Sequence, residues 1–251
     1  MNDHAAVAAD LEPAHGLSQI ERVVDAFVAP TKTFTDILRS TSWWLPFLLM
    51  VLITLGVNVA VDRQVGFLRV SENMVHNSPK QEEALNSLTP EQRAARMQIS
   101  SKITRYISYG SPVLILVFSA IGALGLWATF NFGLGARTTF GQMLCLWMYC
   151  SLPRLLGGLL TILLLFFGGN AENFNLQDQV GTNIGYYLTD PAPWLKSAMS
   201  FFDILSFWVM LLMIIGTSIV AKVSKGKAAA VILGWWVIIL AISVASAAAF
   251  S

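Results

Sequence analysis

The sequence is poor in charged residues. Asp, Glu, Lys and Arg make up only 12% of its 251 residues, against about 25% in a typical soluble domain. A soluble globule needs a polar surface even when its core is apolar, so this deficit argues against one. Intrinsic disorder is excluded as well, because 55% of the residues are hydrophobic and the net charge is only +1.

Residues that support catalysis or bind metals are also scarce. The three histidines (His4, His15 and His76) lie outside the apolar stretches and lack metal-ligand spacing. Cys145 and Cys150 fall on different sides of a helix, which disfavours a disulfide between them. Neither H-E-x-x-H nor G-x-S-x-G occurs. We therefore expect a protein that is not an enzyme and has no catalytic residues, no cofactor and no metal site.

Two further classes are disfavoured. A net charge of +1 provides no attraction for nucleic acid over the whole chain, so we expect no such partner. Residues 1–16 contain no apolar segment, so we expect no cleavable signal peptide.

Long stretches with little or no charge dominate the rest of the chain. Each is close to the 20 or so apolar residues that a helix needs to cross a bilayer, and helices satisfy their own backbone there. The predicted spans are Trp43–Val61, Pro112–Phe132, Met143–Phe167, Phe202–Ala221 and Ala228–Phe250. The predicted fold is all-α, a polytopic bundle of five transmembrane helices with amphipathic helices outside the spans.

The distribution of Lys and Arg predicts the orientation, because cytoplasmic segments carry an excess of them. With the N-terminus inside, the inner segments hold Arg22, Lys32, Arg39, Arg137, Lys222, Lys225 and Lys227. The loop between spans three and four holds only Lys196, whereas the loop after span one holds seven basic residues. That loop is long, so its charges weigh less. We predict a multi-pass protein, in the inner membrane if bacterial, with a cytoplasmic N-terminus and the C-terminus outside.

Two segments outside the spans have helical patterns. Residues 1–42 form a cytoplasmic segment in which apolar residues recur at helical spacing from Leu17 to Leu38, typical of helices along the membrane surface or of a cap packed on the bundle. The membrane domain, 43–251, includes an extracytoplasmic helical loop, 62–111. Ser78 and Thr89 each precede a proline and are predicted N-caps. The helix after Thr89 is either an interfacial basic helix or a solvated one.

Arg154 is the unusual residue of span three. An arginine at the centre of a membrane helix costs roughly 2.5–3.5 kcal/mol on insertion scales. The preceding Pro153 predicts a helix kink that frees the carbonyl of Tyr149. Arg154 therefore either binds an anion or a lipid headgroup in a polar cavity, or pairs with backbone carbonyls or with Asp203. Together with Asn58, Arg154 and Asp203 are the candidate intramembrane polar site.

Small residues recur every four positions in span five, at Ala241, Ala245 and Ala249. Such a stripe suits close helix packing. We expect it to pack within the chain rather than between copies, although a protein partner or a homo-oligomer stays possible.

Several segments resemble the Yip domain family, named for proteins that interact with Ypt/Rab GTPases. They are Phe27-x-x-Pro30 with Phe34, Trp43-Trp44-x-Pro46, Gly135–Phe140, Tyr149–Pro153, Phe202–Trp208, Gly216 and Lys222–Ala228. The long loop after the first span is similar to that of bacterial members. The resemblance implies five spans and a cytoplasmic N-terminus. Rab binding is not carried over, because only residues 1–42 precede the first span.

Two functions follow as hypotheses. The first is a non-enzymatic protein that organises the membrane or scaffolds partners, in contact with membrane lipids. The second is a small transporter or channel whose polar path includes Arg154, Asp203 and Asn58. An enzyme acting on lipid ranks third, because no set of acid, base and nucleophile is visible.

Overall fold

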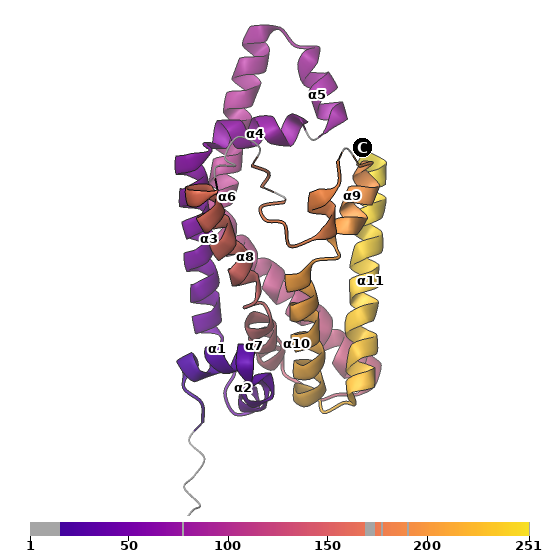
Figure 1. Ribbon diagram of the computed structural model, residues 1–251. Helices are drawn as coiled ribbons and strands as arrows, with labels where there is room; N and C mark the ends of the chain where they lie inside the picture. Colours follow the sequence, from indigo (N-terminus) through magenta and orange to yellow (C-terminus); the bar gives the residue numbers. More distant parts are fainter. Residues whose placement is uncertain (1–15, 77, 169–173, 177, 190, 251) are drawn as a thin grey trace, which may run out of the picture.

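The computed structural model describes residues 16–76, 78–168, 174–176, 178–189 and 191–250. These residues form helices and no β-sheet, which confirms the all-α prediction. In the described residues the long helices run side by side along the bundle (Figure 1). These passes are α3 (Trp44–Gln64), α6 (Pro90–Ala128), α7 (Phe140–Cys150) with α8 (Arg154–Phe167), α10 (Ile204–Val220) and α11 (Lys225–Phe250).

Four of these passes are long and apolar enough to cross a membrane. They are Trp44–Gln64, Pro90–Gly133, Phe140–Phe167 and Lys225–Ala249. The fifth predicted span is the apolar helix α10, which has 17 residues and is at the lower end of the lengths that span a bilayer. The prediction of a multi-span helical bundle is therefore confirmed, while the count of five depends on this short helix.

Helix α6 is much longer than its predicted span. Its 39 residues extend for about 58 Å at 1.5 Å per residue, roughly twice the hydrocarbon thickness. It begins at Thr89, whose hydroxyl accepts from the Gln92 amide as predicted, whereas the Ser78 side chain makes no cap bond. Its first half projects beyond the bundle beside α4 (Phe67–His76) and α5 (Pro79–Asn86) (Figure 1). This basic segment is therefore the first part of the helix that contains the second predicted span, and not a separate helix. Its placement in the interface or in solvent stays a prediction.

The N-terminal helices close the opposite end of the bundle. Helix α1 (Gln19–Val28) and helix α2 (Pro30–Ile37) pack on each other, and α2 packs on α10. Arg22, Thr33 and Phe34 are fully buried there. Of the two alternatives for residues 1–42, the packed cap is the one observed. Residues 1–15, with His4 and His15, lie outside the described residues.

Two apolar stripes face outward. On α1, Ile20, Val24 and Val28 are exposed on the side away from the cap contacts. On α11, Ala241, Ala245 and Ala249 are exposed. The expected packing of this alanine stripe within the chain is therefore wrong, because α11 contacts α9 (Pro193–Ser200) and α10 through its other faces.

Candidate functional site

The helical pass containing Arg154 is broken. Helix α7 ends at Cys150, residues 151–153 form a turn, and α8 begins at Arg154 with Pro153 as its N-cap. The two pieces then take different neighbours: α7 packs on α6 and α10, and α8 packs chiefly on α3. The kink predicted at Pro153 is thus a complete break, and α8 diverges from α10 on one side of it.

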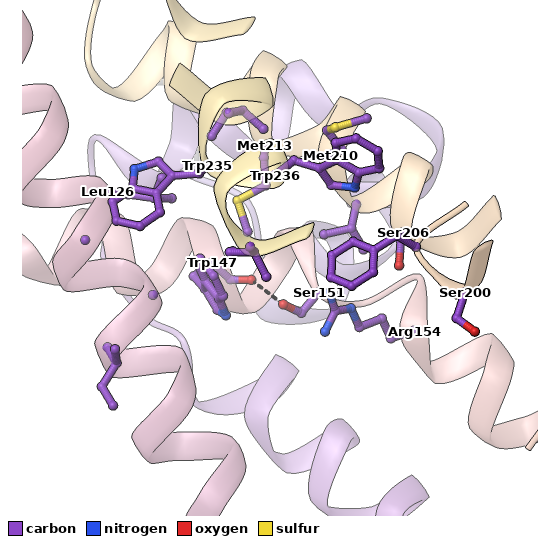
Figure 2. A pocket seen from close by; sticks show the side chains of 17 residues that line it. Leu126, Trp147, Ser151, Arg154, Ser200, Ser206, Met210, Met213, Trp235 and Trp236 are labelled. Carbon is purple, nitrogen blue, oxygen red and sulfur yellow. Dashed lines mark hydrogen bonds between the residues drawn. The ribbon is translucent and has the colours of Figure 1, made fainter. Parts of the chain in front are cut away.

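An apolar cavity of about 600 Å³ lies beside this break, between α6, α7, α10 and α11. Trp147, Trp235 and Trp236 line it together with Met210 and Met213. Figure 2 shows Trp147, Ser151 and Arg154 along one wall, with the two α11 tryptophans and the methionines across from them. We call it the tryptophan cavity. Aromatic and thioether side chains of this kind adapt to apolar ligands.

A second cavity, of about 400 Å³, lies on the α8 side of the break. Its wall includes Asp178, Gln179 and Asn183 from the loop before α9, and Asp203 at the start of α10. An antiparallel bridge between Asn183 and Asp203 attaches this loop to α10. We call it the polar cavity.

Arg154 joins the two cavities. Arg154, Ser200 and Ser206 are the residues that line both of them. Arg154 lies deep within the helical bundle, where many protein atoms surround it. Its side chain is nevertheless exposed, because it faces the open space of the two cavities. In Figure 2 its guanidinium extends toward Ser151.

Among the described residues, no group forms an ion pair with this guanidinium. Within the described part of the chain, Arg154 forms no side-chain hydrogen bond and no ion pair, and Asp203 acts on it only as a more distant charge. The Tyr149 carbonyl, which the sequence suggested as an acceptor, accepts from the Leu152 amide instead. Neither structural role predicted for Arg154, pairing with carbonyls or with Asp203, is seen.

The acidic residues of the polar cavity differ in their partners. Asp178 forms an ion pair with Lys196 (Oδ2 to Nζ, 3.1 Å) and accepts from the Asn183 amide. Asp203 Oδ1 accepts from the Ser206 amide at 2.7 Å and so caps α10. Asp203 has no ion-pair partner among the described residues.

Asn58 lies elsewhere. It is buried between α3 and α6, where its Nδ2 donates to the Ser108 carbonyl at 2.6 Å. The structure therefore brings Arg154 and Asp203 to one cavity and leaves Asn58 outside it.

Sequence reasoning missed most of the cavity wall. Trp235 and Trp236 were part of a predicted span, with no sign that their rings face a void. The polar loop residues Asp178 and Gln179 were also missed. A usable signal was present in Asp178 and Lys196, two opposite charges in a loop next to a span that contains an arginine.

These features define a polytopic helical membrane protein. Among its spans lies a site with one apolar cavity and one polar cavity, and Arg154 lines both. The chain belongs to the Yip1 domain family, whose model matches residues 24–246. This match confirms the family expected from the sequence and covers both cavities, but it leaves out Arg22. No curated protein and no solved structure matches the chain.

Proposed function

We propose that this protein is a non-enzymatic membrane-organising protein that holds a phosphate-bearing amphiphile, such as a membrane lipid, at Arg154. The observation that carries the proposal is the position of this guanidinium, unpaired, where an apolar and a polar cavity meet. Arginine binds phosphate through paired, charge-assisted hydrogen bonds. An amphiphile would place its phosphate at Arg154 and an apolar chain in the tryptophan cavity.

The energetic cost of Arg154 supports this proposal. A charge kept within membrane-spanning helices is costly unless something pairs with it. The described residues supply no hydrogen-bond or ion-pair partner for Arg154, so we propose a bound anion as its partner. The proposal includes no chemical step, and the described residues contain no group of three or more potential metal ligands.

A small transporter or channel is the second candidate. The polar cavity, with its carboxylates and amides, favours it. However, the polar path predicted for a transporter included Asn58 with Arg154 and Asp203, and Asn58 lies instead in the contact between α3 and α6. Reconstituted vesicles separate the two functions, since only a transporter moves its substrate into the lumen.

The proposed orientation places the α1–α2 cap in the cytoplasm and the C-terminus outside, as the basic residues of the short connections favour. The test uses single added cysteines at the two ends of the full chain. A membrane-impermeant thiol reagent should label the C-terminal position from outside intact cells and the cap position only after lysis. Equal labelling of both from one side would contradict the orientation and an odd number of spans.

The test of the lipid site is lipid retention. The full-length protein, Arg154→Gln and Arg137→Gln would be purified in mild detergent, and bound phospholipid counted by native mass spectrometry. Arg137 is an exposed arginine in the α6–α7 connection, which makes it a matched control. We expect Arg154→Gln to lose bound phospholipid and Arg137→Gln to keep it. Equal retention by all three proteins would overturn the proposal.

A further inference from the structure

Among the described residues that line the polar cavity, one charge of each sign has no ion-pair partner. Arg154 has no counter-ion, and Asp203 has a backbone cap bond but no ion pair among the described residues. Asp178, by contrast, is neutralised by Lys196. A simple anion would satisfy Arg154 and be repelled by Asp203, whereas a ligand with both charges would satisfy both residues.

The lining also indicates which kind of cation faces Asp203. The described residues that line the polar cavity include no aromatic side chain. Quaternary ammonium groups are usually held by aromatic cages. A primary ammonium has three hydrogen-bond donors, which suit a carboxylate and the nearby carbonyl and hydroxyl oxygens. The three tryptophans all line the other cavity, which contains no carboxylate.

We infer that the site is selective for a zwitterionic amphiphile whose headgroup pairs a phosphate with a primary ammonium, as in phosphatidylethanolamine. The phosphate lies at Arg154, the ammonium at Asp203, and an acyl chain in the tryptophan cavity. Ser200 and Ser206 line both cavities and add hydroxyl groups beside the phosphate. This inference rests on the proposed function and specifies its ligand.

The test is competition among lipids with identical acyl chains. The full-length protein would be placed in nanodiscs with equal amounts of phosphatidylethanolamine, phosphatidylcholine and phosphatidylglycerol, and retained lipid identified by native mass spectrometry. We expect phosphatidylethanolamine to be preferred by about tenfold to a hundredfold, the range for one hydrogen bond to a charged group. Equal retention of the three lipids would overturn the inference.

Asp203→Asn tests the ammonium site. Asn caps helices as well as Asp does, so this variant removes the charge and keeps the start of α10. We expect the preference to shift from phosphatidylethanolamine to phosphatidylglycerol. Asp203→Ser is a second capping variant in case the first folds poorly, and Asp25→Asn on α1 is the matched control. An unchanged preference in both Asp203 variants would overturn the inference.

Two further experiments use the wild-type protein and change only the ligand. N-acetylated phosphatidylethanolamine keeps the phosphate and the chains but lacks the ammonium, so the wild-type protein should bind it no better than phosphatidylglycerol. Soluble O-phosphoethanolamine has the headgroup alone and should fail to displace the lipid; effective displacement would point to a soluble ligand.

If Arg154→Gln keeps its lipid, the proposed function fails. If Arg154→Gln loses lipid while the Asp203 variants keep their preference, only the zwitterion inference fails.

Discussion

Asn58 donates its side-chain amide to the carbonyl of Ser108, at 2.6 Å. That carbonyl lacks its helical partner because residue 112, four positions later, is a proline inside α6. The Ser111 hydroxyl donates to the same oxygen. Asn58, which the sequence suggested as part of a transport path, therefore donates to a backbone carbonyl that Pro112 leaves without its helical donor. Helix α6 is continuous through this point.

We expect Asn58→Leu to lower the free energy of unfolding by about 0.5–1.5 kcal/mol, the net contribution of one hydrogen bond, because the Ser111 hydroxyl still donates to the same carbonyl. Pro112→Ala restores the backbone donor, so the double variant should recover most of this loss. Unfolding in mixed detergent and SDS measures all four proteins. A loss that stays the same in the Pro112→Ala background would contradict the assignment. Lipid retention should not change.

Arg22 should contribute strongly to stability. Its side chain is fully buried, donates to the Asp36 carboxylate and to the carbonyls of Asp36, Ser40 and Ser42, and lies 5.8 Å from the Tyr149 ring centroid. Removing one partner of a buried pair costs about 3–5 kcal/mol, which we expect for Arg22→Met. Arg39→Met is the control, because Arg39 pairs with the same carboxylate from an exposed position and should cost less than about 1 kcal/mol. Equal effects would contradict this ranking.

The cap should also be sensitive to acid. Burial raises the pKa of Asp36, but the hydrogen bonds from Arg39 and Arg22 outweigh burial and hold it below the usual 3.8. A lowered pKa means that the stabilisation is complete above pH 3.8 and is lost as the pH falls through the folded-state pKa. Thermal unfolding in detergent from pH 6 downward should show this loss. The difference between wild type and Asp36→Asn should shrink at low pH; a constant difference would count against the linkage.

Arg154→Leu should behave in the opposite way to Arg22→Met. Because Arg154 has no hydrogen-bond or ion-pair partner among the described residues, removing its charge should keep or raise the stability of the ligand-free protein, by up to about 3 kcal/mol. The same thermal unfolding experiment on delipidated protein measures this. A large loss of folded protein would instead indicate a structural role for Arg154.

Gly122 controls the width of the tryptophan cavity. A Cβ at Gly122 would lie 2.2 Å from Trp147 Cη2, so the ring must move. At Gly125 the nearest atom is 3.7 Å away, on Trp235, an ordinary contact. We expect Gly122→Ala to shift the tryptophan fluorescence and reduce lipid retention, and Gly125→Ala to do neither. Matching behaviour of the two variants would place Trp147 outside the lipid site.

The sequence predicted the spans well because lipid-facing helices need uninterrupted apolar residues, a property that is visible residue by residue. It did not predict the break at 151–153, since the apolar pattern continues through it and the choice between a kink and a break depends on which neighbours α7 and α8 pack against. The same proline rule that suggested a free carbonyl at Tyr149 applies instead to Ser108, where a partner on another helix is available. The sequence predicted Arg154 and Asp203 as site residues because they are charged residues within apolar spans. It could not predict the polar cavity that they line, because that cavity arises from the packing of separate segments.

The turn at 151–153 has one more consequence. Because α7 and α8 pack on different neighbours, the paths of the helices create the space beside the turn, and Gly122 then determines how closely Trp147 can approach α6. A substitution at the rim of the tryptophan cavity, such as one at Trp235 or Met213, should therefore change the shape of that cavity without removing it.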